Sequence, residues 1–301
     1  MITNFDQMFE QLRSKPKKRL VAAWGVDDHT ISAVYMAGEA GIVEGILVGD
    51  EAMIQTVCKE HGYDINKLTV VNNPNELKSI SQAVDMVNAG EADILMKGLC
   101  STDKYMRGIL NKEKGLLPPK AVLSHVCVVQ HPEYHKLLVI SDIAVIPAPD
   151  LKQKQAMINY TVSTAKALGV EKPKVAMITA TEQMLPGMPA CVEAAMLAKM
   201  SERGQISGCV VDGPLALDVA ICKEAAEIKK LKSEVAGDAD CLVFPNIESA
   251  NVFYKLAGHF SPGVKMAAMV AGAKAPCVLS SRADSTEVKL NSIALAALTA
   301  K

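Results

Sequence analysis

Two stretches of the chain combine cationic and hydroxyl side chains with an expected helix start, a pattern typical of anion-binding sites. In the first, ADILMKGLCSTDKYMRGIL, a buried strand should end at Lys97, and Ser101 or Thr102 can cap the following helix. A helix start presents unpaired backbone N–H groups and partial positive charge, and Lys97 and Arg107 lie close by in the sequence. An ordinary strand, turn and capped helix would use the same residues, so this stretch alone does not decide.

The second stretch, PCVLSSRADSTEVKL, puts Ser281 and Arg282 directly after an expected strand. A guanidinium can hold a phosphate through two parallel hydrogen bonds, and Ser281 adds a hydroxyl donor. Asp284 and Glu287 supply carboxylates within a few residues, so a phosphate clamp would stand beside a possible base. This combination suits attack of a thiol on an acyl phosphate, although a capped helix with a surface ion pair is equally compatible with it.

A third stretch, DADCLVFPNIESANVFYKLAG, contains Asn251 and Lys255 four residues apart. On a helix this spacing puts both side chains on one face, from which both could reach a cleft. A solvated helix surface is the ordinary alternative.

Other chemistries lose their best evidence in this sequence. In HPEYH, His131 and His135 would share a face only on a helix, and Pro132 disfavours a helix there, so no metal site is predicted. The chain has no G-x-x-x-x-G-K-[ST] loop, no G-x-G-x-x-G after a strand and no G-x-S-x-G elbow. A kinase, a Rossmann dehydrogenase and an esterase of these types are therefore not indicated.

The composition indicates a soluble cytoplasmic protein that binds neither nucleic acid nor membrane. With 301 residues, 50% of them hydrophobic, and a net charge of −1, the chain lacks the basic field that captures nucleic acid. Its 8 cysteines form no C-x-x-C pair, and several lie in apolar runs, as expected for core residues in a reducing compartment. The start has no apolar signal core, and no apolar run is long enough to span a membrane.

These motifs must be held by short apolar runs that alternate with segments of helical spacing. Such alternation is typical of parallel sheets covered by helices on both faces. The expected strands are residues 19–24, 43–48, 68–71, 93–96, 174–179, 208–211, 241–244, 265–270 and 277–279. The expected helices are residues 30–40, 51–60, 76–88, 153–168, 190–201, 215–227, 250–257 and 285–299.

The alternation breaks once, between residues 122–129 and 137–146. Both segments have strand character, and the short link of residues 131–136 suits an antiparallel hairpin better than a crossover. We expect this break to mark the seam between two α/β domains. Whether the last strand and helix return to the first domain is left open by the residues alone.

Read together, these segments resemble the phosphate acetyl/butyryltransferase family over nearly the whole chain. The block GDADCLVFPNIESANVFYK, combined with a Ser-Arg pair near the end, is specific to that family, and VDGPLALD and SRADS are closer to its butyryl branch. The remaining matching blocks are ILVGD, ADILMKG, KEKGLLP, LSHV, YHKLL and AGAKAPCVLSSRADS.

The resemblance implies two α/β domains with largely parallel sheets and an interdomain cleft, in the architecture of isocitrate and isopropylmalate dehydrogenases. In that architecture residues 1–127 and 268–301 form the first domain, and residues 128–267 form the second. The implied reaction is reversible transfer of a short acyl group, preferably butyryl, between coenzyme A (CoA) and inorganic phosphate. Acyl-CoA, phosphate and acyl phosphate would be its ligands, without a cofactor, in a homodimer or larger homo-oligomer.

The resemblance also assigns roles to individual residues. Ser281 and Arg282 match a Ser-Arg pair expected to hold phosphate and stabilise the transition state. The other positions that match cleft-lining residues of the family are Ser101, Thr102, Ser124, Asp142, Asn251 and Lys255.

One position departs from the family pattern. Acetyl-specific relatives carry an aspartate seven residues beyond the serine of the pair, expected to deprotonate the CoA thiol, whereas this chain has Val288. A free thiol with a pKa near 8.5 is only a few per cent ionised at neutral pH, so a base or nearby positive charge is needed. Asp284 or Glu287 would have to serve. No acyl-enzyme is required, and Cys100 and Cys127 are expected to pack in the core.

Three alternatives stay open. A phosphate acetyltransferase or broad short-chain phosphotransacylase is close, because one methylene changes discrimination by only about 1–3 kcal/mol. A metal- and NAD-dependent decarboxylating dehydrogenase of the same fold would use Asp212 and Asp218 as metal ligands, but the chain lacks a recognisable cofactor loop. A non-catalytic sensor of CoA or acyl phosphate is the third.

Overall fold

The structure, a computed structural model, describes residues 1–281 and 284–301. Its contacts divide the chain into a terminal unit, Phe5–Leu123 with Ala267–Lys301, and a central unit, Met1–Asn4 with Ser124–Met266. The first residues belong to the central unit because Ile2 is buried there and donates its N–H to the Leu168 carbonyl at 2.8 Å.

The terminal unit is built on a mostly parallel sheet. Its strand order is β3-β2-β1-β4-β11-β10, in which only the β10–β11 pair is antiparallel among the described pairs of this unit. Buried apolar runs fill β1 and β4, as expected for strands covered on both faces. The strands are β1 Lys18–Ala23, β2 Val43–Gly49, β3 Thr69–Asn72, β4 Ile94–Lys97, β10 Lys265–Ala271 and β11 Cys277–Val278.

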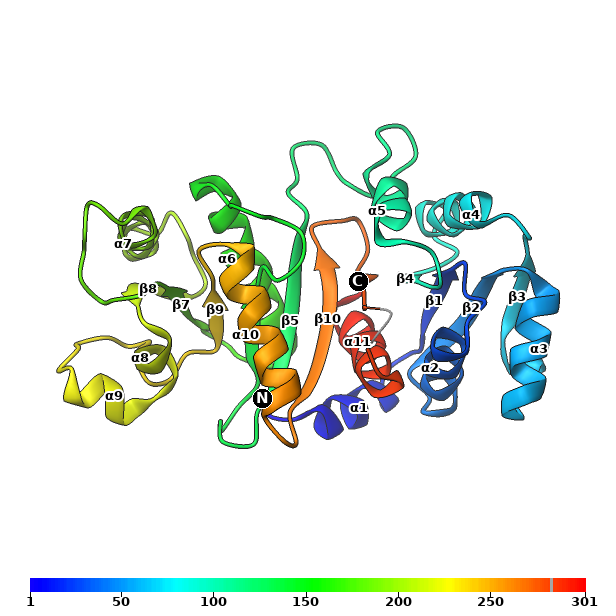
Figure 1. The fold of residues 1–301 in the computed structure, drawn as a ribbon, viewed down its shortest axis with the longest axis horizontal. Coiled ribbons are helices and arrows are strands. Elements are labelled where there is room, and N and C mark those ends of the chain that lie inside the picture. Colours follow the sequence, from blue (N-terminus) through cyan, green and yellow to red (C-terminus); the bar gives the residue numbers. More distant parts are fainter. Residues whose placement is uncertain (282–283) are drawn as a thin grey trace. The chain divides into compact units, whose positions relative to one another are not determined.

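Side-chain caps begin most helices of this unit. Asp27, Asp50, Asn75, Ser101 and Ser285 each accept a backbone N–H of the first turn, which satisfies a donor that the helix itself cannot pair. Figure 1 shows α4 and α5 on one side of the sheet and α2 and α11 on the other. The helices are α1 Phe5–Arg13, α2 Asp28–Glu39, α3 Glu51–His61, α4 Glu76–Asn88, α5 Thr102–Leu110 and α11 Thr286–Thr299.

The C-terminal helix returns to the start of the chain. Helix α11 packs against α1 and α2, so segments from the two ends of the sequence lie side by side (Figure 1). The Ser292 hydroxyl accepts the N–H of Ala268 at 2.9 Å, which ties α11 to β10. The expected helix over residues 285–299 is confirmed.

The central unit contains a second mostly parallel group of strands, in the order β5-β6-β9-β7-β8. The antiparallel hairpin expected from the sequence is confirmed, with Val128 opposite Val139 in the β5–β6 pair. The other described pairs in this unit are parallel. The strands are β5 Ser124–Gln130, β6 Leu138–Ser141, β7 Lys174–Ile178, β8 Val210–Leu215 and β9 Cys241–Val243.

The prediction of a strand over residues 137–146 is wrong in its second half, where the structure has a turn instead. Strand β6 ends at Ser141 because the next side chain turns the backbone. The Asp142 Oδ1 atom accepts the N–H groups of Ala144 and Val145, each at 2.8 Å. These local hydrogen bonds compete with a continuing strand ladder.

The single helix expected over residues 215–227 is also wrong. Leu215 ends β8, and the helical part is split at Cys222, whose backbone is extended. The N–H of Gly237 donates a hydrogen bond to the Val219 carbonyl at 2.7 Å, and the N–H of Ala239 donates one to the Ala220 carbonyl at 3.2 Å. Carbonyls engaged by a distant segment are less available to continue the helix. The helices of this unit are α6 Leu151–Ala167, α7 Pro189–Glu202, α8 Leu217–Ile221, α9 Lys223–Ile228 and α10 Ile247–Phe260.

Within the two described ranges, no helix has the length and apolar character required to cross a bilayer.

Candidate active site

The carboxyl ends of three neighbouring strands meet at one edge of the terminal unit. Strands β1, β4 and β11 are parallel, with Ala23 beside Lys97 and Val278 beside Met96. The chain therefore leaves β4 at Lys97 and β11 just before Ser281 at the same edge of the sheet. Ligands of open α/β sheets bind outside this edge.

A glycine permits the close approach of β4 to β1 at this edge. The N–H of Gly98 donates to the Ala23 carbonyl at 3.0 Å, and that of Leu99 donates to the Trp24 carbonyl at 2.9 Å. A Cβ on Gly98 would lie 2.1 Å from the Trp24 carbonyl oxygen. Only a residue without a side chain fits this close approach of the two backbones.

Lys97 brings a buried positive charge to the strand end. The side chain is 5% exposed, and its Nζ donates to the Gly98 carbonyl at 3.3 Å. Its charge lowers the pKa of the neighbouring Cys100 thiol, but burial is the larger effect and raises that pKa to about 11. The Cys100 thiol is therefore neutral at physiological pH and poorly suited to act as a nucleophile.

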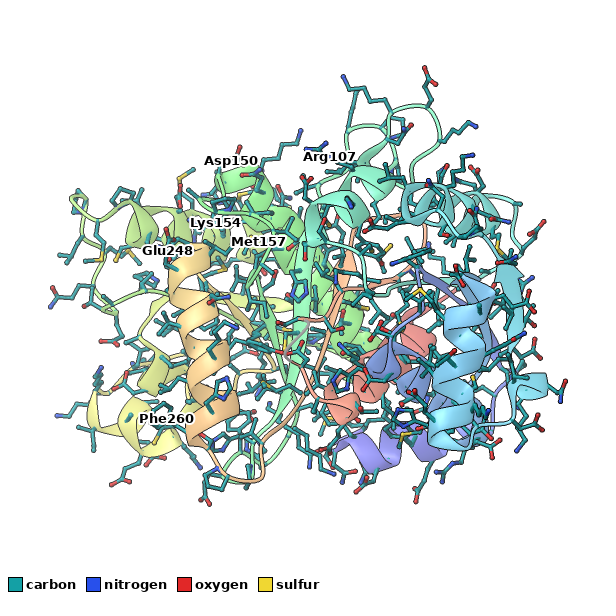
Figure 2. The ribbon with its side chains drawn as sticks, turned by 45° about the vertical axis from the view of Figure 1, so that its right-hand side comes forward. Arg107, Asp150, Lys154, Met157, Glu248 and Phe260 are labelled. Carbon is teal, nitrogen blue, oxygen red and sulfur yellow. The ribbon has the colours of Figure 1, made fainter. Side chains whose placement is uncertain are left out.

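The predicted helix start after Lys97 is present as α5. The Ser101 hydroxyl accepts the N–H of Lys104 at 3.3 Å, and Thr102 begins the helix with an exposed side chain. The unpaired N–H groups of this first turn form a donor set for an anion. Arg107, labelled in Figure 2, lies in the last turn and is 79% exposed. It pairs with Asp103 of the same helix at 3.1 Å.

Tyr105 is a residue that the sequence reasoning missed. Its buried hydroxyl lies 3.2 Å from the Leu95 carbonyl and 3.1 Å from the Val278 carbonyl. One side chain of α5 thus links the neighbouring strands β4 and β11. The only local signal was an apolar position one turn after the cap, which says nothing about a second strand.

The loop after β11 is organised around Ser281. The Ser281 N–H donates to Asp284 Oδ2 at 2.6 Å, and its carbonyl accepts the Asp284 N–H at 3.2 Å. Ser281 itself is exposed, whereas the preceding Ser280 is 8% exposed. Arg282, the predicted phosphate ligand, and Ala283 lie outside the described residues.

The two candidate bases differ in their surroundings. Asp284 is half-buried and already accepts the backbone N–H of Ser281. Glu287 is exposed in the first turn of α11, where a carboxylate is favoured by the helix dipole. Which of them removes a proton stays a prediction.

A lysine that the sequence reasoning did not single out lies beneath this loop. Lys289, 4% exposed on α11, donates from Nζ to the Ser281 carbonyl at 3.0 Å and to the Ser280 hydroxyl at 3.3 Å. Burial lowers the pKa of this ammonium, and the nearby carboxylates of Asp27, Asp284 and Asp28 oppose that effect.

Four predicted site residues belong to the central unit, and three of them meet around the turn after β6. Asp142 is 1% exposed, and its Oδ2 accepts the Ser124 hydroxyl at 3.0 Å and the His125 N–H at 2.9 Å. With the two bonds to Oδ1 described above, this carboxylate accepts four hydrogen bonds. A carboxylate so fully bonded suits a structural role better than proton transfer.

Asn251 holds α10 to the same turn, because its Nδ2 donates to the Ile143 carbonyl at 3.1 Å. Lys255 lies one helical turn further on and is exposed. The two residues thus lie on one helix, at the spacing that was predicted to give a shared face. Within the described part of the chain, a contact to the turn is shown for Asn251 and not for Lys255.

The histidines of HPEYH have ordinary partners. His135 Nε2 lies 2.9 Å from Asp238 Oδ1, and His131 Nδ1 accepts the N–H of Glu133 at 3.2 Å. Four side chains of HPEYH line a cavity of about 850 Å³ in the central unit, namely His131, Glu133, Tyr134 and His135. Across residues 1–281 and 284–301, no group of three or more His, Cys, Asp and Glu side chains is arranged to hold a metal ion.

The aspartates weighed as metal ligands are engaged as well. Asp212 Oδ1 accepts the N–H of Gly213 at 2.8 Å. Asp218 pairs with Lys229 at 3.4 Å and is 58% exposed. These contacts describe a side chain that bonds the next backbone N–H within β8 and a surface ion pair.

Comparisons with known proteins agree along the whole chain. A family model described as Phosphate acetyl/butaryl transferase matches residues 74–297. The phosphate butyryltransferase of Clostridium acetobutylicum is 46% identical over 300 residues, covering 100% of this chain and 99% of the relative. The phosphate acetyltransferase of Thermotoga maritima is 42% identical over 293 residues, covering 97% and 98%. A branched-chain phosphotransacylase from Enterococcus faecalis V583 superposes with a TM-score of 0.82 at 29% identity, covering 94% and 98%.

The α/β fold, together with these full-length relatives, defines an acyltransferase. The chain belongs to the phosphate acetyl/butyryltransferase family.

Proposed function

We propose that this protein is a phosphate butyryltransferase, which reversibly transfers a butyryl group between CoA and inorganic phosphate. The observation that carries the proposal is the convergence of Lys97, the α5 start and Ser281 at the carboxyl ends of parallel strands. The preference for butyryl is supported by the 46% identity to the phosphate butyryltransferase of Clostridium acetobutylicum.

Acyl-CoA, phosphate and acyl phosphate are the proposed ligands, and no cofactor is proposed. The reaction moves an acyl group without any net oxidation or reduction. Hydrogen-bond donors and fixed positive charge can stabilise the oxyanion that forms at the carbonyl. The α5 N–H groups, the Ser281 hydroxyl and the Lys97 ammonium are donors and charges of this kind.

In the forward direction a phosphate oxygen attacks the thioester carbonyl carbon, and the carbon–sulfur bond then breaks. The electron pair of that bond leaves with the CoA sulfur. Arg282 is proposed to orient the phosphate through two hydrogen bonds, with Ser281 donating to the same anion or to the oxyanion. Both ligands must be bound together, because this route has no acyl-enzyme.

In the reverse direction the CoA thiol must lose its proton before attacking the acyl phosphate. Glu287 is the better-supported base, since it is exposed in the first turn of α11. Asp284 is occupied by the Ser281 N–H and is proposed to hold the loop. Positive charge at this edge would also favour the thiolate.

The central-unit residues are proposed to bind the acyl-CoA. Ser124 and Asn251 surround the turn that Asp142 organises, and Lys255 offers an exposed ammonium suited to a phosphate of CoA. Arg107, exposed on α5, is proposed to assist in the same way.

A second function, phosphate acetyltransferase or a broad short-chain transferase, is supported by the 42% identity to the Thermotoga maritima enzyme. The two differ in how kcat/KM changes among acetyl-, propionyl- and butyryl-CoA. A difference of one methylene is expected to change kcat/KM by about 10- to 200-fold.

The direct test mixes the protein with butyryl-CoA and phosphate and follows free thiol with a colorimetric reagent. We expect release that requires both substrates and that continues after treatment with a metal chelator. Absence of release with every acyl-CoA of two to five carbons would refute the proposal. Tight CoA binding without turnover would instead favour a sensor.

We also propose the isocitrate and isopropylmalate dehydrogenase architecture, a cytoplasmic location and a homodimer or larger homo-oligomer. The location is supported by the 8 cysteines, which are all free thiols, as is usual in a reducing compartment. The oligomer is supported by Val252, Leu256 and Phe260, which expose 65%, 54% and 80% of their surface along α10. Phe260, at the end of this helix, is labelled in Figure 2. Light scattering of the wild type and of Phe260→Glu would test it.

A further inference from the structure

Lys289 is an unusual residue for the place that it occupies. It lies in the first turns of α11, where its N–H bonds to the Ser285 carbonyl at 3.1 Å, and only 4% of its surface is exposed. Lysine is almost never fully buried unless its ammonium is paired. The contacts of this ammonium therefore need an explanation.

The hydrogen bonds of the Lys289 ammonium go to the loop that follows β11. Its Nζ donates to the Ser281 carbonyl at 3.0 Å and to the Ser280 hydroxyl at 3.3 Å. Both acceptors are neutral, so neither balances the charge by itself. A charged donor nevertheless makes a stronger hydrogen bond than a neutral one.

Negative charge reaches Lys289 through space from two directions. Asp27 and Asp28 face it from the start of α2, which packs on α11, and Asp284 faces it from the loop. Asp27 uses Oδ1 to cap α2 at 3.0 Å, while its Oδ2 is buried and has no hydrogen-bond partner among the residues that the structure describes. This arrangement keeps an ammonium in the interior without fixing it in a salt bridge.

The Asp284 carboxylate and the Lys289 ammonium, which carry opposite charges, bond the backbone N–H and the backbone carbonyl of Ser281. The Asp284 carboxylate accepts the Ser281 N–H at 2.6 Å, and the Lys289 ammonium donates to the Ser281 carbonyl at 3.0 Å. The direction of the Ser281 hydroxyl depends on the backbone orientation that this clamp sets. Misplacement of a reacting group by about 1 Å can cost roughly 100-fold in rate.

We propose that Lys289 is a positioning residue for acyl transfer, which sets Ser281 against the phosphate and adds positive charge beneath it. The inference rests on the proposed function. Lys289 would act through Ser281, since its buried ammonium donates to the Ser281 carbonyl.

The test compares Lys289→Met and Lys289→Arg with the wild type in the thiol-release assay. For Lys289→Met we expect kcat/KM for phosphate to fall by roughly 10- to 100-fold, with a much smaller change in KM for acyl-CoA. Lys289→Arg should recover part of the loss, because a guanidinium keeps the charge and donates to the same acceptors.

The pH profile provides a readout that a purely structural residue would not change. Because burial lowers the pKa of Lys289, its charge is lost earlier than usual as pH rises, and kcat/KM should decline on the alkaline side. In Lys289→Arg this decline should move to higher pH, since arginine stays protonated. This variant keeps the test valid if Lys289→Met does not fold.

Lys136→Met is the matched control. Lys136 is 8% exposed and pairs with Asp238 and Asp240 at the amino end of β9, so its loss should lower Tm without changing the alkaline decline. Wild-type thiol release with unchanged constants and pH profile in both Lys289 variants would overturn the role of Lys289 alone. No release by the wild type would overturn the proposed function and this inference with it.

Discussion

Substitution of Gly98 by alanine should damage both stability and catalysis, because the added methyl group has no room. Its Cβ would lie 2.1 Å from the Trp24 carbonyl oxygen, 2.5 Å from the Trp24 carbonyl carbon and 2.8 Å from the Ala23 oxygen. Ordinary contact begins near 3.4 Å, so the first distance falls short by 1.3 Å (3.4 minus 2.1). All three atoms are backbone atoms and cannot rotate away as a side chain could.

The cost is set by what must move. Relief requires β4 and β1 to separate where Gly98 and Leu99 donate to Ala23 and Trp24. Overpacking usually costs about 1–3 kcal/mol, and rigid neighbours favour the upper end. A loss of about 3 kcal/mol corresponds to a fall in Tm of roughly 6–12 °C for a unit of this size.

Catalysis should fall further than stability alone requires. A shift of about 1 Å at the end of β4 would displace Lys97 and the start of α5, and such a shift can lower kcat/KM by roughly 100-fold. Thermal unfolding and thiol release, both measured well below the lowered Tm, separate the two effects.

Gly187→Ala is the control for Gly98→Ala. A Cβ at Gly187 meets nothing within 4 Å, and its φ is not in the left-handed region, so Tm and kcat/KM should match the wild type. If Gly98→Ala behaved like Gly187→Ala, the close crossing of β4 and β1 would be refuted, and with it the proposed basis for the site's geometry.

Three further predictions follow from individual side chains. Asp284→Asn should keep most of the activity because its amide oxygen can still accept the Ser281 N–H, whereas Asp284→Ala should lose roughly tenfold in kcat/KM; equal losses would indicate a base instead of a clamp. Iodoacetamide at neutral pH should label the exposed Cys222 but not Cys100, whose pKa burial raises to about 11, and peptide mass analysis showing the reverse would contradict this. Burial raises the pKa of Asp238, but hydrogen bonds from lysines and a histidine outweigh it and lower the pKa below its usual range. Its stabilising effect should therefore be present above about pH 4 and be lost as pH falls further, so that the urea midpoints of the wild type and Asp238→Asn converge in acid.

The parallel strands and the hairpin could be predicted because their signals are local. Apolar runs mark β1, β4 and β7, and the short link after β5 allows only an antiparallel return. The end of β6 and the break at Cys222 could not be predicted in this way. They depend on Asp142 capping its own turn and on Gly237 taking a carbonyl of α8, contacts that periodicity does not record.

The candidate site shows the same division. Lys97, Ser101 and Ser281 could be named from the sequence because each follows a strand or begins a helix. Tyr105 and Lys289 could not, since each acts on a strand end brought near only by folding. A lysine in an otherwise apolar stretch of α11 was the one available signal, and burial alone gives it meaning.

The position of β11 within the terminal unit has a consequence for how the enzyme is made. This strand lies between β4 and β10, although its sequence comes about 180 residues after that of β4. A ribosome will have delivered every residue of the central unit before it translates β11, so that unit can fold during synthesis. The nascent terminal sheet, by contrast, cannot be completed before then, because β4 still lacks its neighbour β11. The strand that leads to Ser281 is therefore among the last to be synthesised, and we expect a chain that ends before it to be inactive in acyl transfer.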